Sequence, residues 1–180
     1  MLILKSASPR RKEILSNLGL DFEVSPSDID EEILPGEQPL EYLRRVTIAK
    51  INSPENFDTN IYVSSDTIVV KNDKIYPKPL RREVCLENLK ELNNTIHSVY
   101  SGLAIYSEGK IIYEYDESII KFKNWSLDEM NDYIENFNPL DKAGGYGIQD
   151  EAGPVKNLTG SYSNVMGFPL RKFFKYKEIW

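Results

Sequence analysis

Short apolar runs typical of strands alternate along this chain with longer runs that have the period of helices. Leu2–Leu4, Ile61–Ser64 and Thr67–Val70 are strand-like, whereas Pro9–Leu18 and Leu40–Lys50 carry apolar residues three and four positions apart. Strands that alternate with helices bury their apolar faces by packing helices against a sheet. The alternation therefore predicts an α/β protein.

The second half of the chain continues this alternation. Further strands are predicted at Lys74–Tyr76, Val99–Tyr106 and Lys110–Glu117, and further helices at Val84–Leu92 and 126–137. Turn residues precede two of the strands, and Ser126 with Glu129 forms a capping box at the start of the last helix. From Asn164 onward we expect helical structure that is interrupted at Pro169, with Ser163 or Asn164 as its cap.

Length and composition indicate one water-soluble domain spanning residues 1–180. The 180 residues match the usual size of a single domain, and 41% of them are hydrophobic, which suffices for a core. No apolar run approaches the roughly 20 residues that cross a bilayer, and Met1–Lys5 is too short for a signal peptide. The only cysteine, Cys85, excludes an internal disulfide. We therefore expect a cytoplasmic protein with no membrane partner and a buried, structural thiol.

The net charge of −6 argues against a general nucleic-acid binder, because such proteins present a basic surface. It leaves open a small anionic ligand. A local basic cluster together with a divalent cation would hold a triphosphate even on an acidic protein.

The segment Ser8-Pro9-Arg10-Arg11 begins the first predicted helix. Ser8 is placed to cap it, and Pro9 suits its first position. Two arginines in the first turn oppose the helix dipole, and an anion bound there would reverse this effect. The segment is therefore either a capped helix start or a phosphate site.

Two acidic positions stand out. Asp28, Asp30, Glu31 and Glu32 form either a solvated loop or a source of a carboxylate ligand for a metal ion. Asp66 separates two strand-like segments, where it is either part of a turn or an aspartate that is paired or bound to metal.

Three basic or polar positions have similar alternatives. Lys78 lies between two prolines, either as a surface residue or as a cation held at fixed geometry. Lys50 shares a helical stripe with Leu43 and Thr47, so its ammonium group either reaches solvent or points into a cleft. His97 is the only histidine and cannot build a His/Cys zinc site with one cysteine, so a structural role is expected.

The segment Asp141–Gln149 is rich in glycine, which permits close backbone approach to a ligand. Its spacing matches neither the dinucleotide-binding fingerprint nor the phosphate loop of ATPases. By itself it is a weak functional signal.

Together these segments resemble the Maf family of nucleotide pyrophosphatases, once linked to septum formation. The resemblance covers essentially the whole chain, with the segments in the same order as in the family. Its most specific parts are Ser6–Glu13 and Asp141–Gln149. Two positions depart from the family pattern, which has Gly-Ala at Ser64-Ser65 and a glycine at the Asn93-Asn94 turn. The small size of serine and the tolerance of asparagine for left-handed turns predict little effect.

The resemblance implies a single elongated domain with a mixed sheet, flanking helices and a central cleft, similar to inosine triphosphatases, and it implies a homodimer. It also implies attack of water on the α-phosphorus of a nucleoside triphosphate, with Asp66 as the base and with Mg²⁺ or Mn²⁺ held by Glu31 and Asp66. The residues expected to surround the phosphates are cationic or lie at a helix start: Ser8, Arg11, Lys50, Lys78 and Lys142.

Within the resembled family, one branch acts on dTTP and UTP and another prefers 7-methyl-GTP. Arg10, Thr67 and Gln149 match the first branch. The amide of Gln149 offers one donor and one acceptor, as the N3–H and C4 carbonyl edge of uracil or thymine requires. The sequence thus predicts a dTTP and UTP pyrophosphatase that also accepts modified uridine triphosphates. The alternatives are a pyrophosphatase for 7-methyl-GTP or inosine triphosphate and a non-catalytic nucleotide-binding regulator of septum formation.

Overall fold

The computed structural model describes residues 1–51 and 59–179. Its strands are β1 (Leu2–Leu4), β2 (Phe22–Val24), β3 (Ile61–Lys71), β4 (Lys74–Tyr76), β5 (Ile96–Ser107), β6 (Lys110–Phe122) and β7 (Val155–Thr159). Its helices are α1 (Pro9–Asn17), α2 (Pro39–Ile51), α3 (Arg82–Leu92), α4 (Leu127–Phe137), α5 (Tyr162–Met166) and α6 (Leu170–Phe173). Short 3₁₀ turns are η1 (Pro139–Asp141), η2 (Ala143–Gly145) and η3 (Phe174–Tyr176).

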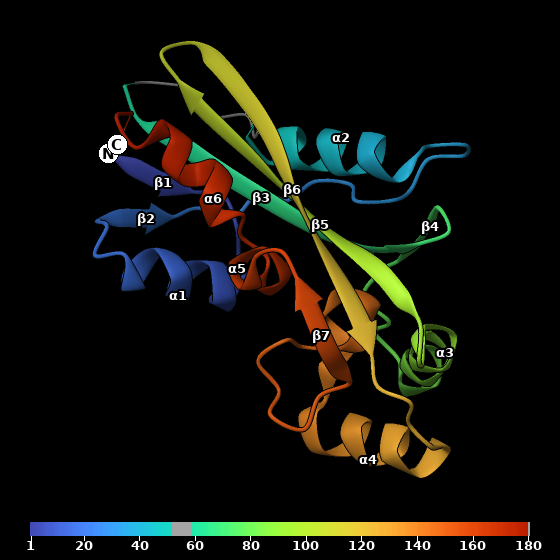
Figure 1. Cartoon of the computed structure of the whole chain (residues 1–180). Coiled ribbons are helices and arrows are strands. Elements are labelled where there is room, and N and C mark those ends of the chain that lie inside the picture. The colour runs from blue at the N-terminus through green and yellow to red at the C-terminus, as the bar shows by residue number, and fades with distance from the viewer. Residues whose placement is uncertain (52–58, 180) are drawn as a thin grey trace. The chain divides into compact units, whose positions relative to one another are not determined.

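The strands form one seven-stranded sheet in the order β2-β1-β3-β5-β6-β7, with β4 paired to β3 (Figure 1). The pairs β1–β2 and β1–β3 are parallel, whereas β3–β4 and β6–β7 are antiparallel. The predicted α/β fold with a mixed sheet and flanking helices is thereby confirmed. Across the described ranges, no helix has the length and apolar character needed to span a membrane.

The chain divides into two compact units. Unit 1 comprises Met1–Thr67, Ser101–Asp116 and Gly167–Trp180, and unit 2 comprises Ile68–Tyr100 and Glu117–Met166. The structure determines each unit by itself. The elongated shape and the central cleft therefore stay predictions.

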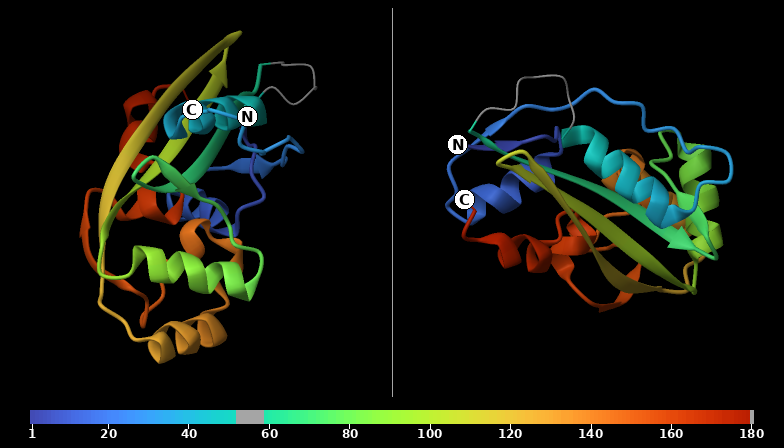
Figure 2. Two further views of the ribbon diagram at one scale, coloured as in Figure 1. Left: turned by 90° about the vertical axis from the view of Figure 1, so that its right-hand side faces the viewer. Right: turned by 90° about the horizontal axis from the view of Figure 1, so that it is seen from above.

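In unit 1, α2 lies on one face of the strands, and α1 and α6 lie on the other (Figures 1 and 2). Strand alternation along β3 fits this arrangement. The Ser64 hydroxyl donates to the Thr47 carbonyl of α2, over 2.6 Å, whereas the next hydroxyl, that of Ser65, donates to the Gly167 carbonyl before α6, over 3.0 Å. Even-numbered residues of this part of β3 thus face α2.

Unit 2 has its own hydrophobic core. α3, α4 and the ends of β3, β5 and β6 supply its buried residues, which include Val69, Leu89, Val99, Ile120 and Ile134. Cys85 of α3 belongs to this core, and burial raises the pKa of its thiol to about 11. A thiol with such a pKa is a poor nucleophile, and its burial confirms the expected structural position.

Several predicted elements needed correction. The strand-like segments Ile61–Ser64 and Thr67–Val70 are parts of one strand, β3, which runs unbroken from Ile61 to Lys71. Of the two alternatives for Asp66 the turn is therefore wrong, and the aspartate is paired, with Lys50. The short strand β2 was not foreseen, since Phe22–Val24 is only three residues long and has no alternating pattern that separates it from a loop. α5 begins at Tyr162, so neither Ser163 nor Asn164 caps it.

Candidate active site

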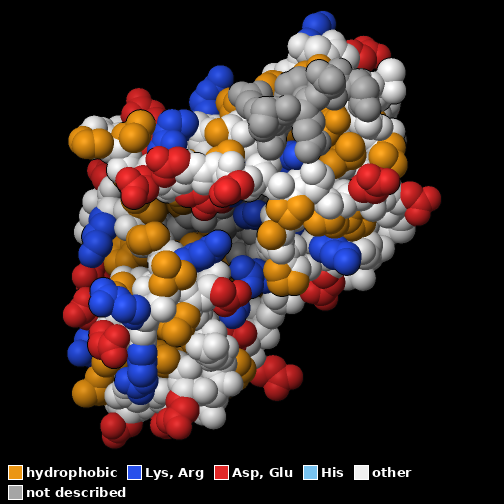
Figure 3. All heavy atoms as spheres, turned by 180° about the vertical axis from the view of Figure 1, so that it is seen from behind, with side chains coloured by type: hydrophobic (Ala, Val, Ile, Leu, Met, Phe, Trp, Pro, Cys, Tyr) orange, Lys and Arg blue, Asp and Glu red, His pale blue; other side chains and the backbone are white. Residues whose placement is uncertain are grey.

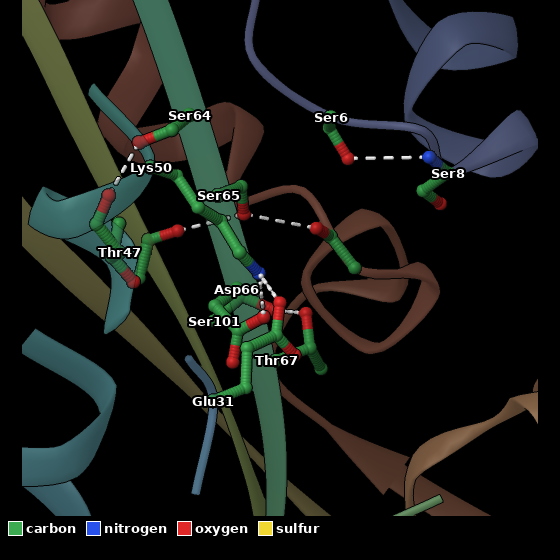
Figure 4. Close-up of polar contacts among 12 residues, drawn as sticks. Ser6, Ser8, Glu31, Thr47, Lys50, Ser64, Ser65, Asp66, Thr67 and Ser101 are labelled. Carbon is green, nitrogen blue, oxygen red and sulfur yellow. Dashed lines mark hydrogen bonds and ion pairs between the residues drawn. The ribbon is translucent and has the colours of Figure 1, made fainter. Parts of the chain in front are cut away.

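Lys50 joins the two carboxylates that the sequence singled out. Its ammonium nitrogen Nζ lies 2.6 Å from Asp66 Oδ1 and 2.9 Å from Glu31 Oε1 (Figure 4). The Lys50 side chain is 9% exposed and that of Asp66 is 13% exposed. Of the two alternatives for Lys50, the structure shows the inward one. A nearly buried ammonium group that bridges two carboxylates fixes their separation and orientation.

Local structure explains this convergence. Asp66 lies two residues after Ser64 in β3, so its side chain points to the same face of the strand, towards α2. Lys50 lies in the last turn of α2, within hydrogen-bond distance of Asp66. The helical stripe predicted from Leu43, Thr47 and Lys50 is buried at all three positions. An ammonium group at the C-terminal end of a helix is also favoured by the helix dipole.

Glu31 belongs to an acidic loop that α2 holds in place. The Tyr42 hydroxyl donates to the Glu31 carbonyl over 3.0 Å, and Arg45 donates to the Glu32 carbonyl over 2.8 Å. Arg45 also binds both carboxylate oxygens of Glu37, over 2.6 and 2.8 Å. The acidic run is therefore a loop, as one reading of the sequence had it, but a loop that presents one carboxylate to Lys50.

Burial raises the pKa of the Tyr42 phenol, and the negative charges of Asp66 and Glu31 raise it further. The hydroxyl therefore stays protonated at physiological pH and acts as a donor. Sequence reasoning missed this residue, although Tyr42, Val46 and Lys50 are spaced four apart and so share one face of α2.

Arg11 forms a second cluster in unit 1. Its guanidinium group donates to the Gly167 carbonyl over 2.8 Å, to Ser6 Oγ over 3.0 Å and to Thr67 Oγ1 over 3.3 Å. Thr67 Oγ1 lies 2.8 Å from Ser101 Oγ. A guanidinium group has five N–H donors, so two of them have no partner among the residues that the structure describes.

The two clusters of unit 1 interact electrostatically. Burial lowers the pKa of Arg11, and the negative charge of Asp66 opposes this shift, as does that of Glu31, whereas Arg10 adds to it. Within the described ranges no carboxylate lies within ion-pair distance of Arg11. The site thus contains a buried cation whose acceptors are all uncharged.

The start of α1 follows the sequence prediction in position but not in detail. Ser8 is the N-cap residue with extended backbone angles, and Pro9 is the first helical residue. The Ser8 side chain makes no capping hydrogen bond, and its backbone N–H donates to Ser6 Oγ over 3.2 Å. Arg10 is half-buried beside it.

The other predicted site residues lie in unit 2. Lys78 is exposed in the loop after β4, and Gln149 is exposed in a turn. Lys142 is mostly covered and forms an ion pair of 3.0 Å with Asp141. Within unit 1 the structure brings together Glu31, Lys50 and Asp66, and the charges of Glu31 and Asp66 act on Arg11. The roles of Lys78, Lys142 and Gln149, which belong to the other unit, stay predictions.

Side chains that the sequence did not single out hold the glycine-rich loop. The Tyr133 hydroxyl donates to Asp150, and the Gly147 N–H donates to the same hydroxyl over 3.0 Å and to Asp150 Oδ2 over 3.2 Å. On the other side of the loop, the Tyr146 hydroxyl lies 2.7 Å from His97 Nε2. His97 is buried and has the structural contact that its isolation in the sequence favoured.

The donor set suits a magnesium or manganese ion that is bound partly by substrate. Within the part of the chain that is described, no group of three or more His, Cys, Asp or Glu side chains forms a complete metal cage. Mg²⁺ is usually held by one or two carboxylates together with phosphate oxygens and water. Asp66 and Glu31, both within 3 Å of one ammonium nitrogen, provide two such carboxylates.

The face of the molecule shown in Figure 3 carries charged side chains of both signs. On the described part of the face shown in Figure 3, Lys and Arg side chains are interspersed with Asp and Glu side chains.

Comparison with known proteins shows the family of the chain. The family model described as Maf-like protein matches residues 1–178. The chain belongs to the Maf family.

Several relatives of this Maf protein align over its full length. A protein of Leptospira interrogans named dTTP/UTP pyrophosphatase is 44% identical over 180 residues, which cover 100% of this chain and 95% of the relative. Its namesake in Leptospira biflexa is 47% identical, with coverage of 100% and 94%. A further namesake, in Aquifex aeolicus, is 37% identical over 177 residues, with coverage of 97% and 92%.

Among solved structures, the Staphylococcus aureus Ham1 protein has a TM-score of 0.46 at 12% identity, over 67% of this chain and 71% of that chain. A likeness of this strength supports no inference about the site.

Proposed function

We propose that this Maf protein hydrolyses dTTP and UTP to the nucleoside monophosphate and pyrophosphate, and that it also accepts modified uridine triphosphates. The observation that carries the proposal is the pair of carboxylates, Asp66 and Glu31, which share the ammonium group of Lys50. Support comes from full-length relatives named dTTP/UTP pyrophosphatase at 44–47% identity.

In the proposed reaction, Asp66 orients a water molecule and accepts its proton as the water attacks the α-phosphorus. Lys50, whose Nζ lies 2.6 Å from Asp66 Oδ1, holds the Asp66 carboxylate in place. The two free N–H donors of Arg11 bind phosphate oxygens on which negative charge accumulates in the transition state. Ser8 and the first N–H groups of α1 bind a further phosphate oxygen. No covalent nucleophile is required.

We propose Glu31 and Asp66 as the ligands of a divalent cation, Mg²⁺ or Mn²⁺. When bound, the ion would neutralise triphosphate charge and polarise the phosphoryl group. We therefore expect chelation of divalent ions to remove activity and either ion to restore it. Full activity in excess chelator would contradict this assignment.

The remaining predicted residues, from unit 2, from the start of α1 and from β3, complete the proposal. Lys78 and Lys142 bind phosphate oxygens, and Arg10, Thr67 and Gln149 select the base. A site that hydrogen-bonds a base edge rejects bases that leave its polar groups unpaired. Gln149 is exposed, so its amide is available to a ligand.

The deciding experiment identifies both the bond that is cleaved and the preferred base. Purified protein with Mn²⁺ or Mg²⁺ is incubated in ¹⁸O-labelled water, and we expect the label in the monophosphate. Release of orthophosphate and diphosphate would place attack at the γ-phosphorus and overturn the proposal. Comparison of kcat/KM for dTTP, UTP, CTP, GTP, inosine triphosphate and 7-methyl-GTP then tests the substrate. A preference for either of the last two would overturn the substrate, and absence of turnover on all six would favour a binding regulator.

We further propose a homodimer as the functional form, on the basis of the family resemblance, and a cytoplasmic location, on the basis of the sequence composition. Sedimentation equilibrium of the full chain tests it, because a protomer of 20.7 kDa predicts a dimer of twice that mass.

A further inference from the structure

Lys5 is a fully buried lysine that the proposed reaction has not used. It follows β1 directly, and only 1% of its surface is exposed. In open sheets of parallel strands, ligands bind beyond the carboxyl ends of the strands. Lys5 lies at such an end, between the ends of its parallel neighbours β2 and β3.

The strand register places Lys5 on the same face as the carboxylate pair. Ile3 aligns with Tyr62 and packs with Ile51 of α2, so Ile3 faces α2. Side chains alternate along a strand, so Lys5, two residues later, faces α2 as well. The Lys5 N–H donates to the Val63 carbonyl over 2.7 Å. Lys5 therefore extends beyond the paired end of β1 next to Ser64, two residues before Asp66.

The two buried lysines on this face differ in their partners. Lys50 has two carboxylates within 3 Å. The ammonium group of Lys5 has one hydrogen bond in the described chain, to Ser25 Oγ at 3.2 Å, and no carboxylate within 4.0 Å. A buried ammonium group without a counter-charge is strongly unfavourable. Lys5 still has two N–H donors available.

We propose that Lys5 binds the phosphate chain of the nucleotide and supplies a further positive charge beside Asp66. This inference rests on the proposed function, which places the α-phosphorus next to Asp66. A phosphate oxygen provides the anionic acceptor that the side chain lacks, and an ammonium group binds phosphate as a point charge. Asp66 and Glu31 do not fill this role, because both already bind Lys50.

The test compares Lys5→Met with Lys12→Met. Both variants remove one positive charge near the start of α1, but Lys12 is exposed. Binding of inorganic pyrophosphate is measured by calorimetry, alongside Tm without ligand and kcat and KM for dTTP. For Lys5→Met we expect pyrophosphate affinity to fall by about tenfold or more, with Tm unchanged or higher because an unpaired buried charge is removed. Lys12→Met should stay within about twofold of the wild type in every measurement.

Pyrophosphate affinity in Lys5→Met equal to that in Lys12→Met would overturn the inference, whatever happens to Tm. Should Lys5→Met fold poorly, Lys5→Gln serves instead, since it keeps a donor for Ser25 and lacks the charge. If the wild-type protein formed no monophosphate, the proposed function would be overturned. The pyrophosphate titration would then still test whether Lys5 binds phosphate, because it does not depend on turnover. Loss of pyrophosphate affinity in both Lys5→Met and Lys5→Gln supports the inference.

Discussion

At the scale of single residues, Lys50 joins two carboxylates that come from distant parts of the chain and that we propose as the metal ligands and, for Asp66, as the base. Asp66 lies in a strand and Glu31 in a loop, and like charges placed close together repel. The ammonium group 2.6 and 2.9 Å from them offsets that repulsion. The chemistry proposed for Asp66 can be tested by a substitution that replaces one oxygen of its carboxylate by nitrogen and leaves the shape of the side chain nearly unchanged.

We predict that Asp66→Asn lowers kcat for dTTP by about a hundredfold or more, because an amide does not accept the proton of the attacking water. The fold and nucleotide binding should be retained, since asparagine has nearly the same shape. Asp73→Asn is the matched control. Asp73 is exposed in the β3–β4 turn with φ of +59°, a conformation that asparagine tolerates. Near-normal turnover in Asp66→Asn would remove this residue from the role of base.

We predict that Tyr42→Phe weakens activity through Glu31. The change removes the hydrogen bond of 3.0 Å to the Glu31 carbonyl and leaves the ring in place. The Glu31 loop should become less ordered, so the Mn²⁺ concentration needed for half-maximal activity should rise about threefold to tenfold. A titration of activity with Mn²⁺ measures this. An unchanged metal requirement with a lower Tm would mean that the hydroxyl has a structural role only.

At the scale of elements, the sequence was sufficient where a local pattern decides the structure. The capping box of α4 is present, with the Ser126 N–H donating to Glu129 Oε2 over 2.7 Å. The buried stripe of α2 and the hairpin turns followed in the same way from spacing and turn chemistry. These features depend on neighbours within four residues, which a single sequence displays.

Other features depend on partners distant in sequence and could not be predicted. Ser65 is buried between the carbonyl groups of Gly102 and Gly167, which satisfy its hydroxyl inside an unbroken strand. Asp66 stays in the same strand because Lys50 neutralises it. Local propensity alone disfavours an aspartate there, and so the sequence suggested a break. Tertiary contacts outweighed that propensity.

The glycine-rich loop permits a prediction that separates backbone strain from packing. Gly145 and Gly109 both have left-handed backbone angles, with φ of +76° and +79°. A Cβ atom at Gly145 would lie 2.7 Å from Cys85 Sγ, whereas one at Gly109 would have no atom within 4 Å. Gly109→Ala should therefore cost about 1 kcal/mol from backbone strain alone. Gly145→Ala should destabilise the protein by at least about 1 kcal/mol more.

Chemical denaturation of both glycine variants measures this difference. Gly145→Ala should also raise KM for dTTP, because Lys142 and Gln149 lie in the same loop, whereas Gly109→Ala should leave KM unchanged. Equal stability of the two variants would show that the core around Cys85 accommodates the extra atom.

At the scale of the whole molecule, the buried ring of His97 couples folding to pH on the acidic side of neutrality. His97 is 3% exposed, its Nε2 lies 2.7 Å from the Tyr146 hydroxyl, and its Nδ1 has no hydrogen-bond partner in the described structure. Burial lowers the pKa of His97 from 6.5 to about 4, and the positive charge of Lys71 adds to the effect. The folded protein therefore holds the neutral ring, whereas the unfolded chain binds a proton below about pH 6.5.

From this difference in pKa we predict a pH-dependent loss of stability on the acidic side of neutrality. The unfolded state binds more protons between about pH 6.5 and pH 4, so the free energy of unfolding rises with pH in that range and is lost as the pH falls through it. Between pH 7 and pH 5 the histidine should account for a loss of about 2 kcal/mol.

Urea denaturation of wild type and His97→Gln at both pH values isolates this contribution, because the titrating carboxylates are common to both proteins. The variant should be less stable than wild type at pH 7, since glutamine does not fill the space of the ring, but its stability should fall less between the two pH values. An equal fall in both proteins would show that the folded state accommodates the protonated ring, and that His97 is not the group that links folding to pH.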